Sequence, residues 1–372
     1  MRTKMFALLA VGLLALGGTA ACTGDDSDDG TATDSGAPRA GAGGGKVGVI
    51  LPDTASSQRW GTDDPKLLKE AFDAADVPVD IQNAQGSKEK FQQIAEGMIA
   101  SDVKVLITVN LDSPTGKVVL AKAKAAGIKT IDYDRLTLNG GADYYVSFDN
   151  VAVGELQGAG LVRCLGEKGY TTPLVADLNG SPTDNNATQF KVGYESVLQP
   201  KYDDGSLMKG PDQSVTDWDN KEAGVIFQQM WDQTDGRIKG VLAANDGLGN
   251  AAIEVLKKYR LNGKVPVTGQ DATVQGLQNI LAGDQCMTVY KQIKKEAQAA
   301  ADLAIKLYKG ESPTTADRVK DPESGAYVPA VLLKPQAIYK NDVNAVIKDG
   351  FVEKKAVCSG RFVALCSENN IK

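Results

Sequence analysis

Short apolar runs alternate with longer amphipathic segments along the first part of this chain. Residues 46–52, 79–84, 103–110, 128–134 and 144–149 have the length and composition of β-strands. The segments between them, which include residues 65–76, 89–100 and 115–127, carry apolar residues at helical spacing. This alternation predicts right-handed βαβ units and a parallel sheet covered by helices on both faces.

The same pattern restarts after residue 150 and predicts a second lobe. Helices are expected from Val153, Asn186, Leu248 and Val274, and strands at residues 173–179, 240–246, 265–271 and 287–291. The fold class is therefore α/β, with two doubly wound parallel-sheet lobes. In such sheets ligands bind beyond the carboxyl ends of the strands, so two facing edges would form a cleft.

Polar side chains gather at these predicted strand ends. They are Asp53, Ser57, Gln58, Arg59, Asp134, Arg135, Asp184, Asn185, Asn186, Asn245, Asp246, Asp271 and Lys291. A sugar hydroxyl both donates and accepts hydrogen bonds, so a sugar site needs carboxylates and amides beside Arg or Lys. Trp60 and Trp218 add flat apolar faces against which the C–H side of a pyranose can lie.

Structural roles for some of these residues are also consistent with the pattern. An Asp at a strand end often caps the following helix, which is an alternative for Asp53 and Asp246. Either Trp60 or Trp218 could belong to the hydrophobic core.

The N-terminus has the features of an export signal. Arg2 and Lys4 precede an apolar run at residues 5–16, which is too short to span a membrane, and Thr19-Ala20-Ala21-Cys22 resembles a lipobox. We expect residues 1–21 to be a signal peptide, Cys22 to be lipidated, and residues 22–45 to form a disordered tether. The alternative is a soluble secreted protein.

Composition excludes several functions for this chain of 372 residues. Its net charge of −6 and the lack of a basic run argue against nucleic acid as a partner. The chain has no histidine, which excludes imidazole metal ligands and Ser-His or Cys-His catalysis. The acidic run at residues 25–30 falls in the tether, where a solvated spacer is expected, so neither a metal nor a cofactor is predicted.

Export permits disulfides among the remaining cysteines. Cys358 and Cys366 close a short local loop and are the first expected pair, which leaves Cys164 and Cys286 as the second. Buried free thiols are the alternative for all four.

Several motifs together resemble the type I periplasmic sugar-binding proteins of bacterial ABC importers, and among them the D-xylose-binding members. The motifs, which occur in the family's order between about residues 46 and 295, are Arg59-Trp60, Tyr133-Asp134-Arg135, SFDN at 147–150, VGELQ at 153–157, GSPTDNNA at 180–187, AND at 244–246, GQDA at 269–272 and MTVYK at 287–291. The resemblance implies that the sugar is hydrogen-bonded by Arg59, Asp134, Arg135, Asn186, Asn245, Asp271 and Lys291. It further implies that Trp218 stacks on the sugar and that Trp60 and Asp184 belong to the site. The sequence departs from the family in the tether, at residues 311–327 and in the cysteine-bearing tail.

The resemblance also implies three hinge crossings, just after Asn150, just after Lys291 and near residues 333–336. The N-terminal lobe would comprise residues 46–150 and 292–333, and the C-terminal lobe residues 151–291 and 337–372. Ligand contacts from both lobes would select the closed state.

The function implied is capture of a monosaccharide, with D-xylose expected, and its delivery to ABC permease subunits. The protein would be a monomer and not an enzyme, held at the extracytoplasmic face of the cell membrane by its lipid anchor alone. Glucose, ribose, arabinose and short xylo-oligosaccharides remain alternative ligands.

Other functions are consistent with the same fold. An intracellular repressor would carry an N-terminal helix-turn-helix where this chain carries an export signal. A glycosidase would need two carboxylates on either side of a scissile bond, and an enclosed monosaccharide site leaves no room for a leaving group. A receptor that presents its closed form to a sensor kinase is the remaining alternative to transport.

Overall fold

The computed structural model describes residues 44–371, so the predicted signal peptide, Cys22 and the tether up to residue 43 lie outside the described residues. The secondary-structure elements are, in chain order, β1 (Lys46–Leu51), η1 (Gln58–Gly61), α1 (Asp63–Asp73), β2 (Val79–Asn83), α2 (Lys88–Ala100), β3 (Val103–Thr108), α3 (Ser113–Ala125), β4 (Lys129–Tyr133), β5 (Tyr144–Phe148), α4 (Asn150–Lys168), β6 (Leu174–Asn179), α5 (Asn185–Asp203), β7 (Met208–Ser214), η2 (Thr216–Trp218), α6 (Asn220–Gln233), β8 (Ile238–Ala243), α7 (Asp246–Lys258), α8 (Val274–Ala282), β9 (Thr288–Tyr290), α9 (Ile293–Tyr308), β10 (Asp317–Lys320), β11 (Tyr327–Leu333), β12 (Gln336–Ile338), η3 (Lys340–Asp342), α10 (Val343–Lys348), α11 (Lys354–Val357) and α12 (Phe362–Glu368).

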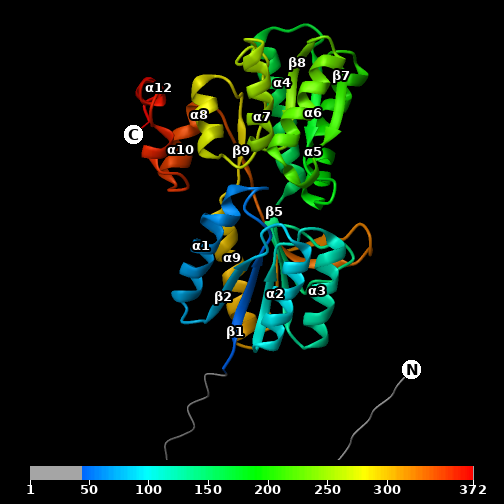
Figure 1. Ribbon diagram of the computed structural model, residues 1–372, viewed down its shortest axis with the longest axis vertical. Helices are drawn as coiled ribbons and strands as arrows, with labels where there is room; N and C mark the ends of the chain where they lie inside the picture. Colours follow the sequence, from blue (N-terminus) through cyan, green and yellow to red (C-terminus); the bar gives the residue numbers. More distant parts are fainter. Residues whose placement is uncertain (1–43, 372) are drawn as a thin grey trace, which may run out of the picture. The chain divides into compact units, whose positions relative to one another are not determined.

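The first sheet has the strand order β10-β11-β5-β4-β3-β1-β2, and its strands are parallel except for the β10–β11 pair. Successive side chains of β1 point to opposite faces of this sheet. Val47, Val49 and Leu51 pack with residues of α1 and α9, whereas Ile50 packs with residues of α2 and α3. Figure 1 shows α1 and α9 on one side of β1 and α2 and α3 on the other. Both faces are therefore covered, as the apolar runs predict.

The second sheet has the strand order β7-β6-β8, with parallel pairing throughout. Helices α4 and α5 of this lobe approach each other at glycines. A Cβ built on Gly154 would lie only 2.0 Å from the carbonyl oxygen of Phe190, and one on Gly193 only 2.1 Å from that of Val151. This close packing fixes α5, whose first turn carries candidate site residues.

Within the described residues the chain passes between the lobes at three places. It leaves the first sheet between β5 and α4, returns between β9 and α9, and leaves again between β11 and β12. Helix α9 packs on the first sheet, β11 pairs with β5, and β12 pairs with β9. The fold is the predicted α/β arrangement of two parallel-sheet lobes.

Some predicted elements differ from those observed. Residues 265–271 do not form the predicted strand, and Val267 makes an isolated bridge to Val241 instead. Pro266 has no backbone N–H and therefore cannot donate a backbone hydrogen bond. Its carbonyl oxygen accepts one from the backbone N–H of Val241 at 2.9 Å. Helices α4 and α7 begin before the predicted Val153 and Leu248 because Asp149 and Asn245 cap them.

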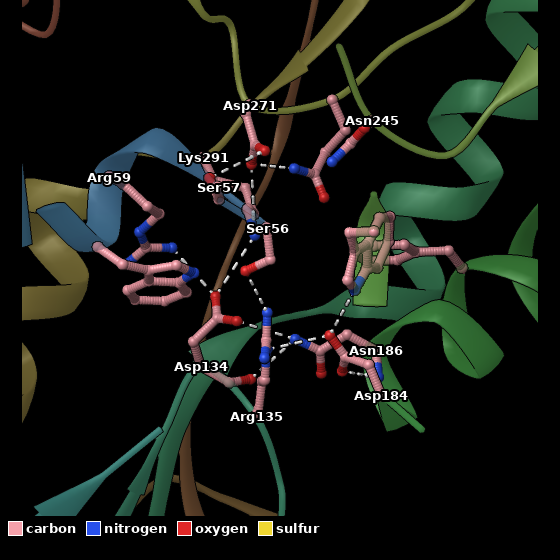
Figure 2. A pocket seen from close by; sticks show the side chains of 14 residues that line it. Ser56, Ser57, Arg59, Asp134, Arg135, Asp184, Asn186, Asn245, Asp271 and Lys291 are labelled. Atoms are coloured by element: carbon pink, nitrogen blue, oxygen red, sulfur yellow. Dashed lines mark hydrogen bonds and ion pairs between the residues drawn. The ribbon is translucent and has the colours of Figure 1, made fainter. Parts of the chain in front are cut away.

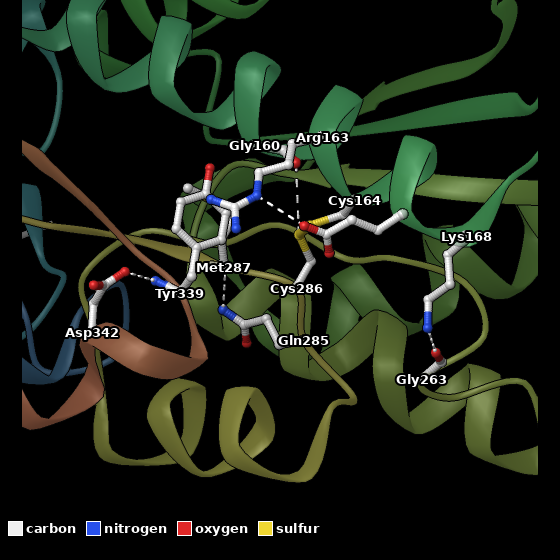
Figure 3. Close-up of a disulfide and its surroundings, with 11 residues drawn as sticks. Gly160, Arg163, Cys164, Lys168, Gly263, Gln285, Cys286, Met287, Tyr339 and Asp342 are labelled. Atoms are coloured by element: carbon white, nitrogen blue, oxygen red, sulfur yellow. Dashed lines mark hydrogen bonds and ion pairs between the residues drawn. A yellow bond between two sulfur atoms is a disulfide. The ribbon is translucent and has the colours of Figure 1, made fainter. Parts of the chain in front are cut away.

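Two disulfides join segments of the second lobe and its tail. Cys164 of α4 is bonded to Cys286 just before β9 (Figure 3), and Cys358 is bonded to Cys366. These are the pairs expected from the sequence. Residues 337–371 add helices that pack against α8, with Val357 and Cys366 among the buried residues of that contact.

Candidate functional site

A cavity lies where the carboxyl ends of the strands meet the first turns of helices, and the space between its side chains, including its opening to solvent, is about 330 Å³. The residues that line it are Ser56, Ser57, Arg59, Trp60, Asp134, Arg135, Asp184, Asn186, Phe190, Trp218, Asn245, Gln270, Asp271 and Lys291 (Figure 2). All of the residues that the sequence predicts to bind sugar are among them. Both sheets contribute, since Asp134 follows β4 and Asn245 follows β8.

Asp134 has several charged neighbours in this cavity. Its carboxylate oxygen Oδ2 accepts a hydrogen bond from Arg59 Nη1 at 3.1 Å and lies 3.4 Å from Lys291 Nζ. Burial alone would raise the pKa of this carboxyl, but Lys291, Arg59 and Arg135 together hold the pKa below its usual range. Asp134 is therefore an ionised acceptor, and it is positioned by a backbone hydrogen bond from its own N–H to the carbonyl oxygen of Val146.

Asn186 reaches the same residue from the other lobe. Its Nδ2 donates to the carbonyl oxygen and to Oδ1 of Asp134, each at 3.0 Å. Its Oδ1 accepts from Asn150 Nδ2 at 2.9 Å, which fixes the orientation of the amide. This contact connects the first turn of α5 to the end of β4.

Asp184 holds two neighbouring side chains in place. It caps α5 by accepting from the backbone nitrogen of Asn186, and its Oδ2 accepts from Trp218 Nε1 at 3.2 Å. The same oxygen lies 3.0 Å from Arg135 Nε, a contact between charges without hydrogen-bond alignment. Because Asp184 is occupied in this way, its main effect is to orient Arg135 and the Trp218 ring.

Asp271 and Lys291 form the opposite wall. Asp271 has the unusual φ of 103° for a residue with a side chain, and its backbone N–H donates to the carbonyl oxygen of Val289. Its carboxylate lies 3.4 Å from Ser57 Oγ and 3.8 Å from Lys291 Nζ. Burial raises the pKa of Asp271, opposed by Lys291 and Arg59, and the nearby Asp134 raises it further.

The alternative capping roles are resolved by the geometry. Asn245, not Asp246, caps α7: its Oδ1 accepts from the backbone nitrogen of Leu248, which leaves Nδ2 as the end available to a ligand. Asp246 is fully buried and accepts hydrogen bonds from Thr273, Gln285 and Thr288. Asp53 orders the loop before η1 by accepting from the backbone of Ala55 and Ser56.

Arg59 is supported from behind the cavity. Its Nε and Nη2 donate to the two carboxylate oxygens of Asp64 at 2.6 Å each, and Nη2 also lies 2.5 Å from Glu296 Oε2. The guanidinium lies over the Trp60 ring, 4.2 Å from its centroid. These contacts leave Nη1 as the group directed toward Asp134 and the cavity. Trp60 and Trp218 are both buried and both line the cavity, so each combines a packing role with a place in the site.

Three lining residues and the support of Arg59 were not predicted from the sequence. Ser56 follows β1, Gln270 lies inside the quoted GQDA motif, and Phe190 lies one helical turn after Asn186. Phe190 also contacts the Trp218 ring edge to face. The role of Glu296 could have been suspected from the sequence, because a Glu at one of the positions that α9 otherwise fills with apolar residues is unusual.

The cavity can therefore bind a neutral, hydroxyl-rich ring. Ionised Asp134 accepts, the Arg and Lys side chains donate, amides do both, and Trp218 with Phe190 provides apolar surface. Among residues 44–371 there is no cluster of three or more Cys, Asp or Glu side chains suited to a metal ion. In the same residues, no helix is long and apolar enough to cross a membrane.

Residues 47–312 match the family described as periplasmic binding protein domain. The chain belongs to this family. It is 36% identical to the D-xylose-binding periplasmic protein of Escherichia coli (strain K12) over 82% of this chain and 90% of that protein. It is 35% identical to the multiple sugar-binding periplasmic receptor ChvE of Rhizobium radiobacter over 84% of this chain and 92% of that protein.

A solved structure gives the same result. A carbohydrate transporter solute-binding protein from Chloroflexus aurantiacus, in complex with D-glucose, superposes with a TM-score of 0.75 at 30% identity, covering 83% of this chain and 97% of that one. This periplasmic binding protein is thus an extracytoplasmic sugar-binding protein of an ABC transporter. Members of the family are transport proteins and not enzymes, as the sequence predicts.

Proposed function

We propose that this periplasmic binding protein captures a single monosaccharide, D-xylose, between its lobes and delivers it to ABC permease subunits as a lipid-anchored monomer. Capture is supported chiefly by one observation: the predicted sugar ligands from both lobes line one cavity with matched donors and acceptors. D-xylose is supported by the 36% identity to a D-xylose-binding protein.

Titration calorimetry of the purified protein tests this function. D-xylose should bind tightly with one site per chain, and D-glucose, D-ribose, L-arabinose and xylobiose should bind more weakly. A pentopyranose lacks the exocyclic CH₂OH of glucose, and a difference of that size changes affinity by about 1–3 kcal/mol. If only another monosaccharide binds tightly, the assignment of D-xylose as the ligand is wrong. If none of these sugars binds, the capture function is wrong.

Lipid anchoring rests on the Thr19-Ala20-Ala21-Cys22 segment, which lies outside the described residues. Cys22→Ser should release the protein from the membrane fraction while sugar affinity stays unchanged. If the variant still sediments with membranes, the anchor at Cys22 is wrong.

A second function, sugar sensing, is favoured by the identity to a protein named as a sugar-binding receptor. In that case the closed form would be presented to a sensor kinase. Deletion of the chain from its host distinguishes the two: loss of xylose uptake supports transport, and loss of a sugar-dependent transcriptional response with normal uptake supports sensing.

A further inference from the structure

The charges around Arg59 do not balance. The cations of this group are Arg59, Lys291 and Arg135, and the carboxylates around them are Asp64, Asp134, Asp184, Asp271 and Glu296. All eight side chains are at least 87% buried, and five carboxylates against three cations leave two excess negative charges. Excess charge that is shielded from water is costly, so one of these carboxyl groups should retain a proton near neutral pH.

Glu296 is the carboxyl group best placed to retain it. The side chain is fully buried and has one direct cation contact, from Oε2 to Arg59 Nη2 at 2.5 Å. Its other oxygen, Oε1, is buried without a hydrogen-bond partner among the described residues. A neutral carboxyl tolerates such a position much better than a carboxylate does. Asp64, by comparison, has two hydrogen bonds from Arg59 and one from Tyr133.

Every element packed against Glu296 contributes to its environment. The titratable and charged groups that face it are Arg59 before α1, Asp64 on α1, Tyr133 and Asp134 at the end of β4, Tyr145 on β5, and Lys291 before α9. Glu296 itself does not line the sugar cavity. Any effect it has on sugar must therefore pass through Arg59.

We propose that Glu296 is a positioning residue of the sugar site that holds Arg59 while protonated, so that ionisation of Glu296 weakens sugar binding. This rests on the proposed sugar capture at the same cavity. A protonated Glu296 still accepts the Arg59 hydrogen bond, and it leaves the guanidinium charge to Asp64 and Asp134. An ionised Glu296 competes with Asp134 for Arg59. It also brings the buried group back to two excess negative charges, which the closed form must then keep away from water.

The pKa of Glu296 agrees with this role. Burial raises the pKa to about 8, against the opposing effect of Arg59, and Asp134 and Asp64 add to the rise. Sugar displaces water from the cavity beside Arg59 and Asp134, which strengthens the repulsion between Asp134 and an ionised Glu296, raises the pKa of Glu296 further and links binding to uptake of a proton. Affinity should then be greatest below the pKa of the sugar-free protein and should fall as pH rises through it.

The test is calorimetric titration of the full protein with D-xylose between pH 6.5 and 9.5, in buffers of different ionisation enthalpy. The wild type should bind with proton uptake and lose about tenfold in affinity over this range, the effect of a one-unit pKa shift on binding. Glu296→Gln, which keeps the acceptor and cannot ionise, should match the wild type at pH 6.5 and show no such decline. Glu296→Ala removes the acceptor and should bind weakly at every pH.

Three outcomes would overturn the proposal: a flat wild-type profile, an unchanged pH dependence in Glu296→Gln, or a loss of affinity at pH 6.5 in Glu296→Gln equal to that in Glu296→Ala. A sugar-free measurement separates this proposal from the proposed function. Because the folded-state pKa is raised above the unfolded value of about 4.3, the wild type should lose melting temperature relative to Glu296→Gln as pH rises from 5 to 8. If no sugar binds, the capture function is wrong, but the melting measurement still tests the protonation of Glu296. A difference in melting temperature between the wild type and Glu296→Gln that stays constant from pH 5 to 8 would refute a protonated Glu296.

Discussion

The side-chain nitrogen of Asn186 lies 3.0 Å from a carboxylate oxygen of Asp134 and 3.0 Å from the carbonyl oxygen of the same residue. Asp134 follows β4 of the first lobe, and Asn186 lies in the first turn of α5 in the second. The amide thus satisfies two acceptors across the cleft with one NH₂ group. The contact between the lobes is therefore made by two residues that line the cavity.

Asn186→Asp should oppose this contact, because a second carboxylate would then face Asp134. We expect sugar affinity to fall by at least about 30-fold, equivalent to roughly 2 kcal/mol for breaking a buried hydrogen bond to a charged group. The melting temperature should fall as well, because two buried carboxylates would then face each other, and the favourable position of an Asp in the first turn of a helix offsets this only in part. Calorimetry and small-angle scattering measure affinity and closure. Asn186→Ala is the control without repulsion, and an aspartate variant that binds as well as the alanine variant would contradict the prediction.

Asp271→Ala should remove sugar binding while the fold is retained. The change deletes a buried acceptor at the cleft, and hydrogen bonds to charged groups contribute about 1.5–3 kcal/mol, or roughly 10- to 150-fold in affinity. Stability should not fall, because burial already raises the pKa of this carboxyl and its removal relieves repulsion with Asp134. Titration calorimetry and thermal melting test this, with Asp232→Ala on the exposed face of α6 as a control. Micromolar affinity retained by Asp271→Ala would refute its place in the site.

The alternation of apolar runs predicts most of the fold because each run becomes a strand buried between helices. It does not predict β7, whose sequence MKGPDQS has no apolar run and contains Gly210 and Pro211. It wrongly predicts a strand at residues 265–271, where the apolar pattern is that of a strand but Pro266 limits the strand pairing. The hydrophobic pattern does not predict a segment whose conformation depends on backbone hydrogen bonding and not on hydrophobicity.

The site is predictable to the extent that polar residues end predicted strands. Arg135 and Asp271 follow this rule, and both line the cavity. Ser56 and Gln270 do not stand out, because a small hydroxyl or amide in a loop is common at any surface. The roles of individual residues are harder to predict from the sequence. Only the structure shows that the Asp184 carboxylate already contacts Trp218 and Arg135.

Gly180→Ala should displace the Trp218 ring. A Cβ on Gly180 would lie 2.0 Å from the ring, so either Trp218 or the loop before α5 must move. Forcing an extra methyl into a packed site costs about 1–3 kcal/mol of stability, and we expect sugar affinity to fall with it. Tryptophan fluorescence and calorimetry measure the two effects. Gly97→Ala is the control, because it lies on the exposed face of α2 with nothing near its Cβ and should stabilise by up to about 1 kcal/mol.

The two disulfides should contribute unequally to stability. Cys164 and Cys286 are 122 residues apart, whereas Cys358 and Cys366 are separated by 8. Loop-closure entropy predicts upper limits of about 5 kcal/mol for the first bond and about 2.6 kcal/mol for the second, since a longer closed loop restricts the unfolded chain more.

Denaturant unfolding of the two double Cys→Ser variants measures this difference. The variant without Cys164 and Cys286 should lose about twice the free energy of unfolding of the variant without Cys358 and Cys366. Sugar affinity should survive in both, because neither bond lines the cavity. A larger loss in the Cys358 and Cys366 variant would mean that the packing of the tail against α8, and not chain entropy, determines how strongly each bond stabilises the fold.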